Sequence, residues 1–175
     1  MKQHWVIYRE TRKENNLFFS DVHFLKYLKT AKNICLCLPE EQTGLRIAKY
    51  VLRPILQNPA SSRRLVLFLE KSLATNFDEF TKANKLFYSN KENSNDSRPS
   101  KNMMEKIRLS KFDVFMDWNT EFHLGNAILG AKSRAFVRIG FENSHSDKFF
   151  NIELSKTENG FLEETYSAVR RMLCL

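Results

Sequence analysis

The sequence predicts an α/β fold, a Rossmann-like three-layer α/β/α sandwich with a mostly parallel sheet of five to six strands. Three observations support this prediction. Short, continuous apolar runs, such as residues 33–38, are typical of strands buried on both faces of a parallel sheet. These runs alternate with segments whose apolar residues recur at helical spacing. Residues 112–141 alone predict a strand, a helix and a second strand, within the roughly 30 residues that a β-α-β unit needs.

The N-terminal part of the chain is expected to differ from the rest. Residues 1–32 are predicted to form a preamble, and residues 33–175 a single Rossmann-like domain. Within the preamble, Ser20 or Asp21 is expected to cap an amphipathic helix. A helix packed on the edge of the domain is one interpretation. The nearby aromatic residues leave a second one open, an arm that docks a partner or an anionic membrane. The expected apolar face of the helix consists of Val22, Leu25 and Leu28.

The remaining predicted strands mostly alternate with helices. Pro54 is expected to kink or shorten the last turn of its helix, because proline lacks the backbone N–H group. Residues 91–100 have no apolar side chain other than a proline ring and are expected to form a mobile loop. Asn119 or Thr120 is expected to cap the helix that follows the fourth strand. Strands are predicted at 33–38, 64–70, 84–90, 112–118, 134–140 and 148–154, the last at a sheet edge, and helices at 45–58, 72–84, 101–110, from 119 or 120 onward, and 161–175.

Composition and charge narrow the class of protein. The length of 175 residues suits one domain with a sizeable core, and the content of 42% hydrophobic residues is that of a globular protein. No apolar run is long enough to predict a membrane span, and the acid-containing start is unlike a secretory signal. The net charge of +8 is spread among 20 acids with only short basic doublets, so nucleic-acid binding is the weaker alternative to a role in solubility.

The cysteines predict a reducing compartment. Cys35, Cys37 and Cys174 are odd in number, and their spacing matches no disulfide framework or zinc site. Since disulfides are rare in the cytoplasm, we expect reduced thiols in a cytoplasmic protein. Cys35 and Cys37 lie two positions apart in a strand, so they share a face and are expected to be buried as small hydrophobic side chains. No metal site and no cofactor are predicted.

Residues 111–141 also carry a recognisable pattern of residue types. In this pattern, together with the strand at 33–38 that precedes Gly44 and a helix, the chain resembles the N-terminal domain of the ADP-heptose:lipopolysaccharide heptosyltransferases. These are two-domain sugar transferases of the GT-B fold. The chain also resembles a family of small single-domain bacterial proteins without an established activity. The residues of the pattern are Lys111, Phe112, Asp113, Met116, Asp117, Gly130, Ala131, Lys132, Arg138, Ile139, Gly140 and Phe141.

The heptosyltransferase resemblance, which covers about residues 33–145, carries an expectation about activity. It implies that an aspartate follows the glycine of the first loop and acts as the catalytic base. In this sequence Leu45 follows Gly44, and the nearby acids Glu40 and Glu41 precede the glycine. The length matches one of the two transferase domains. We therefore expect a bacterial, non-catalytic glycosyltransferase-like module that acts through a protein partner or by self-association. The alternative is a sugar- or phosphate-binding subunit that a second domain or chain completes.

Candidate binding residues lie in the loops that follow the predicted strands, where ligands bind in open parallel sheets. The loop at 39–44 presents the backbone N–H groups of Gln42, Thr43 and Gly44, which could hold an anion at a helix start. The loop contains neither a dinucleotide fingerprint nor a P-loop motif. An ordinary turn is the competing interpretation. In the ligand-binding alternative, Lys132 and Arg138 would contact an anionic ligand.

Candidate catalytic residues cluster after the strand at 112–118. Asp117 ends that strand and His123 follows it closely, and a carboxylate beside a histidine can act as a general base. Glu41 is the third candidate base, and Asn119 is a candidate ligand-binding residue. The competing interpretation is structural: Asn119 caps the next helix and Asp117 accepts hydrogen bonds from nearby backbone N–H groups.

Overall fold

The computed structural model describes the chain except for residues 1–20, 59–62, 90–97, 156–160 and 174. Several expectations therefore lie outside the described residues. They are the preamble up to Ser20, most of the predicted mobile loop at 91–100, and Cys174. Among the described helices, none combines the length and the apolar character needed to span a bilayer.

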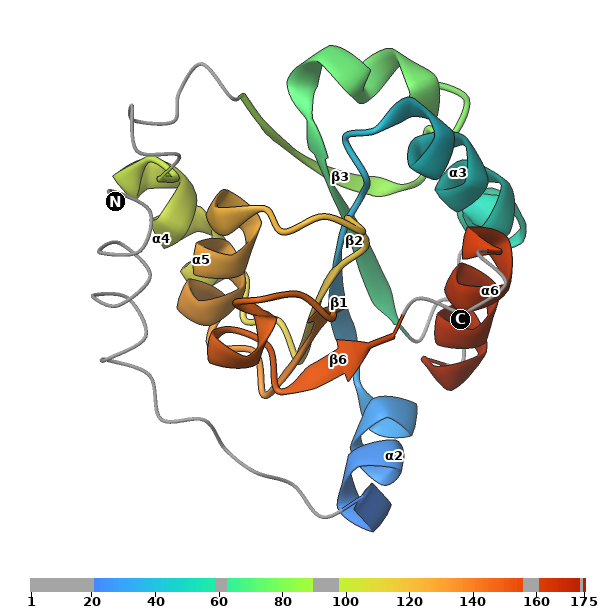
Figure 1. Ribbon diagram of the computed structural model, residues 1–175. Coiled ribbons are helices and arrows are strands. Elements are labelled where there is room, and N and C mark those ends of the chain that lie inside the picture. The colour runs from blue at the N-terminus through green and yellow to red at the C-terminus, as the bar shows by residue number, and fades with distance from the viewer. Residues whose placement is uncertain (1–20, 59–62, 90–97, 156–160, 174) are drawn as a thin grey trace.

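A sheet of six strands, parallel throughout, forms the centre of the protein, with helices on both faces (Figure 1). The predicted α/β sandwich is thus confirmed. The strand order is β3-β2-β1-β4-β5-β6, so the direction of the crossovers reverses between β1 and β4. At such a point the loops that leave the two strands diverge and open a crevice. The strands are β1 (Asn33–Cys37), β2 (Arg64–Glu70), β3 (Asn84–Tyr88), β4 (Val114–Asp117), β5 (Val137–Phe141) and β6 (Ile152–Leu154).

The helices divide between the two faces of the sheet. The main core cluster holds buried residues of α2, α3 and α6 on one face, and α4 and α5 pack on the other. Alternate residues of β1 face the two layers. Ile34 and Leu36 belong to the main core, whereas Cys35 and Cys37 face α4 and α5. The helices are α2 (Asp21–Thr30), α3 (Gln42–Gln57), α4 (Lys101–Leu109), α5 (Leu124–Ser133) and α6 (Leu162–Met172), and the 3₁₀ helices are η1 (Lys71–Phe77) and η3 (Ser146–Lys148).

The two described cysteines confirm the prediction made for them. Both side chains are fully buried, and neither forms a disulfide. Burial raises the pKa of the Cys37 thiol well above its usual value, with Cys35 and Asp117 adding to the effect. A thiol that stays protonated in an apolar layer is a poor nucleophile and a poor metal ligand. The pair therefore serves as core packing between β1 and the helices α4 and α5.

Two helix predictions differ in detail from the structure. Helix α3 begins at Gln42, three residues before the predicted start, and runs to Gln57, close to the predicted end. Pro54 does not shorten its last turn, because the proline is exposed and the next turn is closed by the Asn58 N–H, which donates to the Pro54 carbonyl at 3.3 Å. Helix α5 begins at Leu124, and its N-cap residue is His123 instead of Asn119 or Thr120. The side chain of Asn119 is engaged elsewhere, as described below.

The elements between β2 and β3 and after β5 are less regular than predicted. The segment predicted as a helix at 72–84 is a 3₁₀ helix followed by turns, although Phe77 and Phe80 are buried as expected. The last strand is confirmed at the sheet edge but is only three residues long. Phe149 and Phe150 precede it and pack against α5 instead of extending the strand. Phe161, expected on the apolar side of the last helix, is 62% exposed and precedes it.

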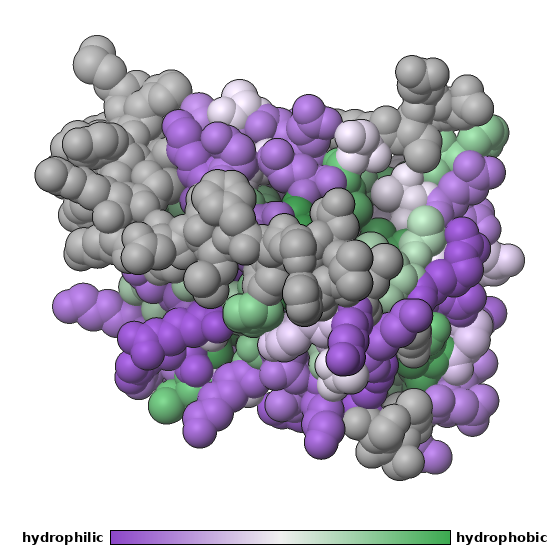
Figure 2. All heavy atoms as spheres, turned by 90° about the horizontal axis from the view of Figure 1, so that it is seen from below, coloured by the Kyte–Doolittle hydropathy of each residue, from purple (hydrophilic) through white to green (hydrophobic). Residues whose placement is uncertain are grey.

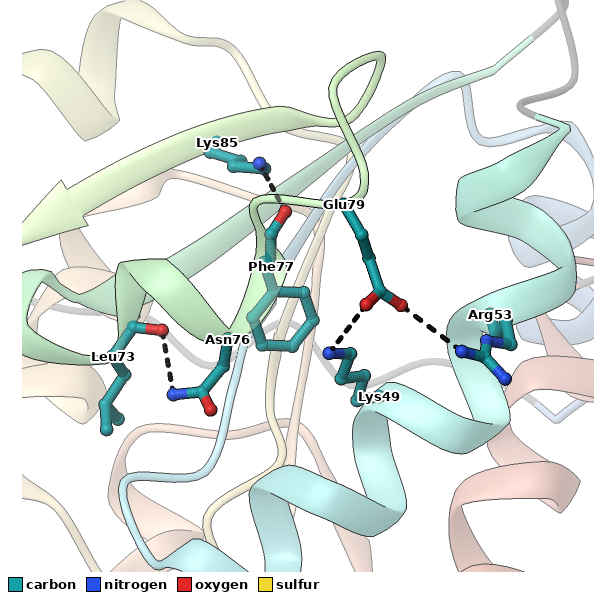
Figure 3. A network of polar contacts seen from close by, with 7 residues as sticks. All are labelled: Lys49, Arg53, Leu73, Asn76, Phe77, Glu79 and Lys85. Carbon is teal, nitrogen blue, oxygen red and sulfur yellow. Dashed lines mark hydrogen bonds and ion pairs between the residues drawn. The ribbon is translucent and has the colours of Figure 1, made fainter.

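An ion-pair network ties the η1–β3 connection to α3 (Figure 3). The carboxylate of Glu79 lies 3.2 Å from Lys49 Nζ and 3.5 Å from an Arg53 guanidinium nitrogen, both on α3. On the strand side, Lys85 Nζ donates to the Phe77 carbonyl at 2.6 Å. The exposed pairs add little stability individually. Together they connect the irregular segment to a helix on one side and to β3 on the other.

Candidate functional site

The loops after β1 and β4 meet at the carboxyl ends of these two neighbouring strands. Asn119 joins them. Its side-chain oxygen accepts the Glu40 N–H at 3.0 Å, and its side-chain nitrogen donates to Asp117 at 2.6 Å and to the Leu38 carbonyl at 3.4 Å. Because its side chain bonds to the loop after β1, Asn119 does not cap α5, which begins at Leu124. The Asn119 side chain therefore holds the two loops together at the switch point of the sheet, where such folds form a ligand-binding crevice.

Asp117 is the last residue of β4, at this switch point. Its side chain is only 3% exposed, and one carboxylate oxygen accepts both the backbone and the side-chain N–H groups of Asn119. Burial raises the pKa of Asp117 from 3.8 to about 6, although the Asn119 hydrogen bonds act in the opposite direction. A carboxyl group with such a pKa gains and loses a proton near neutral pH, as a general acid or base must.

Asn126, in the first turn of α5, adds an unusual feature to the crevice. It is 4% exposed, and its side-chain nitrogen makes no hydrogen bond to any described group. The amide nevertheless lies close enough to Asp117 to favour the charged carboxylate. Leaving a buried N–H donor unsatisfied costs about 1–3 kcal/mol. This donor and the Asp117 acceptor therefore form a polar pair that a hydrogen-bonding ligand could satisfy.

His123 pairs with Glu40 at the more exposed rim of the crevice. His123 Nδ1 lies 3.3 Å from Glu40 Oε1, and the same oxygen accepts the Tyr88 hydroxyl at 2.6 Å. The hydrogen bond to Glu40 raises the pKa of His123 above 6.5, against the opposing effect of burial, and Asp117 adds a smaller contribution. Burial raises the pKa of Tyr88, so the phenol is a donor here. The histidine is thus protonated more readily than a free one.

The N-terminus of α3 is occupied by a side chain of the protein itself. The two carboxylate oxygens of Glu41 accept the backbone N–H groups of Thr43 and Gly44, each at 2.7 Å, and these bonds lower the pKa of Glu41. Gln42 begins the helix and is exposed. Two of the three backbone donors that the sequence suggested for an anionic ligand, those of Thr43 and Gly44, are therefore bonded to a carboxylate of the protein itself. Leu45, the residue after the glycine, is 1% exposed and belongs to the main core.

The structure divides the predicted site residues between two ends of the sheet. Asp117, Asn119 and His123 come together at the carboxyl end, near Glu41. Lys132 lies in the last turn of α5 and Arg138 near the start of β5, so both lie toward the amino end. They are not part of the crevice.

Two residues of the crevice, Tyr88 and Asn126, were not predicted from the sequence. Glu40 was named there, but its contacts with His123 and Tyr88 were not expected. Tyr88 ends β3 and Glu40 follows β1, so a search of every strand end for polar side chains would have found both. Asn126 gives no such signal, because its neighbours in α5 are apolar and its side chain is buried. Within the described ranges, no three His, Cys, Asp or Glu side chains are placed to hold a metal ion.

Several residues of the 111–141 pattern have structural tasks. Asp113 accepts the backbone N–H groups of Lys32 and Asn33, at 2.7 and 2.9 Å, and so joins the start of β4 to the start of β1. Gly130 lets α5 approach the Phe115 ring so closely that an added Cβ atom would lie 3.0 Å from it. The pattern therefore identifies a way of packing a helix on parallel strands rather than a set of reacting groups.

Comparison with known proteins gives similarity in structure alone. No family model matches the sequence, and no curated protein is similar to it. The ADP-heptose LPS heptosyltransferase II of E. coli superposes with a TM-score of 0.59 at 13% identity, over 78% of this chain and 39% of the transferase. The E. coli heptosyltransferase WaaC with ADP gives a TM-score of 0.58 at 10% identity, over 81% and 46% of the two chains.

A third solved structure extends the likeness to another bacterium. The family 9 glycosyl transferase of Veillonella parvula superposes with a TM-score of 0.59 at 16% identity, over 81% of this chain and 41% of the transferase. The chain thus spans less than half the length of each of these structures. At such low identity the likeness concerns the fold. The described part of the chain has the α/β fold found in a part of the heptosyltransferases and other GT-B glycosyltransferases, as the resemblance predicted.

Proposed function

We propose that this chain is a glycosyltransferase-like module that does not transfer sugar by itself and acts by binding a protein partner or a second copy of itself. The loop after β1 carries the proposal. Leu45 follows Gly44 and is buried, and the neighbouring carboxylate of Glu41 is bonded to two backbone N–H groups of α3. A carboxylate held in this way, with a lowered pKa, is a weak base toward a sugar hydroxyl.

The extent of the structural likeness supports the same proposal. The chain corresponds to less than half of each transferase, and a GT-B enzyme works in the cleft between two domains. The residues described in this structure correspond to one wall of such a cleft, which supports a role in binding. Since a fold does not determine a function, the proposal depends on the site and not on the likeness.

Two measurements test this proposal. The purified chain is incubated with ADP-heptose and a lipopolysaccharide acceptor, and the release of ADP is followed; we expect no release above the rate in buffer. Light scattering after size exclusion, over a wide range of protein concentration, then gives the mass in solution. A dimer supports self-association, and a monomer implies that the partner is a different protein.

Turnover that depends on the acids of the crevice would contradict the proposal. The decisive variants are Glu41→Gln and Asp117→Asn, each of which removes one candidate base. Glu163→Gln, which removes an exposed acid from the first turn of α6, is the matched control. ADP release that is lost in either crevice variant and kept in the control would assign catalysis to this chain.

A second candidate function is favoured by the unsatisfied amide of Asn126. It is a subunit that binds a sugar and needs a second domain or chain for any reaction. A sugar hydroxyl donates and accepts hydrogen bonds, so it suits the Asn126 donor beside the Asp117 acceptor. The nearby carboxylates of Glu40 and Glu41 disfavour a phosphate group in the same crevice.

Thermal unfolding with neutral sugars and with ADP tests this second function. Because a ligand that binds the native state raises Tm, we expect a saturable rise with a heptose and none with ADP. The rise should disappear in Asn126→Ala. A rise that is unchanged in this variant, or no rise with any sugar while the protein is folded, rejects the function.

A further inference from the structure

A cavity of about 280 Å³ lies at the opposite end of the sheet from Asp117, where β2 and β3 begin. Its walls come from the last turns of α3, from the start of these two strands and from α6. Ile55, Leu65 and Ala83 contribute apolar lining; each packs against the main core and is only partly buried. This volume, equal to about nine water molecules in the liquid, is just below the range of typical small-molecule pockets.

The charged side chains around this cavity are all positive. Arg63, Lys82 and Arg170 line it, and none of the other described residues in its lining has an acidic side chain. The Arg63 guanidinium donates to the backbone carbonyls of Leu173 and Lys29, and the structure gives it no ion pair with a described side chain. Arg170 Nε is buried and makes no hydrogen bond to any described group. Cationic side chains beside apolar surface are complementary to an anion with an apolar body.

One wall of the cavity is connected to α3 by ion pairs. Lys82 and Ala83 belong to the connection whose Glu79 pairs with Lys49 and Arg53 of α3 (Figure 3). Among the coloured residues of Figure 2, which shows the molecule from below, hydrophilic side chains predominate, with smaller apolar areas between them. A preformed cavity loses little free energy to ordering when a ligand enters.

We propose that this cavity binds a small amphipathic anion, a carboxylate with a medium-length alkyl chain. The carboxylate would pair with Arg170 and Lys82, and the alkyl chain would lie against Ile55, Leu65 and Ala83. This site is independent of the crevice at Asp117 and of the proposed function.

A series of straight-chain carboxylates from acetate to dodecanoate tests the proposal by calorimetric titration, with each ligand below its critical micelle concentration. Burial of a methylene group is worth about 0.8 kcal/mol, so the affinity should rise about fourfold for each added methylene. The rise should stop when the cavity is filled. Alkylammonium ions of the same chain lengths are the charge-reversed controls and should not bind.

Variants separate the two parts of the proposed contact. Arg170→Gln should weaken decanoate binding about tenfold or more, because a hydrogen bond between charged groups is lost. Lys71→Gln, at an exposed position beyond the carboxyl end of β2, is the matched control and should have no effect. Ile55→Trp should abolish binding by filling the cavity. If that variant does not fold, Ala83→Leu narrows the cavity from the opposite wall and should likewise weaken binding.

Three results would overturn the proposal. The first is that no carboxylate of any length binds to the folded protein. The second is that acetate or inorganic phosphate binds as tightly as decanoate, which would indicate a site for the anionic head alone. The third is that decanoate and decylammonium bind equally, or that Arg170→Gln leaves the affinity unchanged, which would indicate non-specific apolar binding.

Discussion

At the scale of single residues, burial decides which side chains of the crevice have unusual chemistry. Glu41 follows β1 and Asp117 ends the neighbouring strand β4, and each accepts two backbone or side-chain N–H groups. The pKa of Glu41 is lowered, because it is at the surface and its hydrogen bonds dominate. The pKa of Asp117 is raised, because the loss of hydration outweighs its hydrogen bonds. Two carboxyl groups with similar hydrogen-bond partners thus have pKa values shifted in opposite directions.

The raised pKa of Asp117 predicts a dependence of stability on pH. Between 3.8 and about 6, the native protein holds a proton that the unfolded chain has released. The carboxyl group therefore contributes stability that is complete below about pH 4 and is lost as the pH rises through about 6. Relative to Asp117→Asn, the protein should lose about 2 kcal/mol of unfolding free energy between pH 4 and pH 7.

Urea unfolding at a series of pH values measures this difference. Asp78→Asn, which also removes one negative charge but from an exposed loop, controls for the change in net charge. If the curves for the protein and for Asp117→Asn run parallel across this pH range, the carboxyl is not buried in solution as it is in the structure.

At the scale of elements, the connection from β5 to β6 depends on a close contact with the sheet. Gly140 in β5 lies under the ring of Phe150, and an added Cβ atom would come within 2.4 Å of that ring. Phe150 is 4% exposed and packs with α5, so the ring has little room to move aside. The absence of a side chain at residue 140 therefore allows the irregular segment before β6 to cover the sheet.

We expect Gly140→Ala to destabilise the protein by roughly 1–3 kcal/mol, because the extra methyl group overpacks a buried contact. Unfolding in denaturant measures the effect. The control is a double-mutant cycle with Phe150→Leu: in that background the same Gly140→Ala change should cost less, since the smaller side chain leaves space. Equal costs in the two backgrounds would mean that the ring does not press on residue 140.

At the scale of the whole molecule, the first described helix is part of the main core. Leu28 and Ala31 of the α2 region are buried in the same cluster as α3 and α6, and the Ala31 N–H donates to the Tyr27 carbonyl at 2.9 Å. Arg63 also connects α2 to the end of α6, because its guanidinium donates to the carbonyls of Lys29 in α2 and of Leu173 just after α6. The segment before β1 therefore contributes to the stability of the sheet that follows it.

Leu28→Ala tests this contribution. Since the side chain is fully buried, its truncation should lower the unfolding free energy by about 2–5 kcal/mol. Lys29→Ala, the next residue and an exposed one, is the matched control and should change the stability by no more than about 0.5 kcal/mol. If the two variants are equally stable, α2 does not belong to the cooperative unit, and the boundary predicted between residues 32 and 33 is supported.

The two ends of the sheet also differ in charge across the whole molecule. The carboxyl end presents Glu40, Glu41 and Asp117 around the crevice. The amino end presents Arg63, Lys82 and Arg170 around the cavity. A net charge of +8 read from the sequence does not reveal this separation. The difference means that the crevice favours neutral or cationic groups, whereas the cavity favours anions.

Much of this arrangement could be predicted from the order of residues. Continuous apolar runs and helical spacing are local signals, and they predicted each strand of the sheet and the buried pair Cys35 and Cys37. The site was predicted less well, because its geometry depends on residues far apart in the chain. Asn119, for example, bonds to Leu38 and Glu40 across 81 and 79 positions, and this task displaced it from the helix cap that local rules assign.

The sequence by itself determined the α/β alternation and the parallel sheet, since each depends on residue type and spacing alone. The tertiary structure decided everything that depends on burial and on distance across the sheet. Burial raises the pKa of Asp117, and Glu41 caps α3. Lys132 and Arg138 lie toward the other end of the sheet, away from the crevice. Hydration and long-range contacts are set by packing, and packing is not a property of any local stretch of sequence.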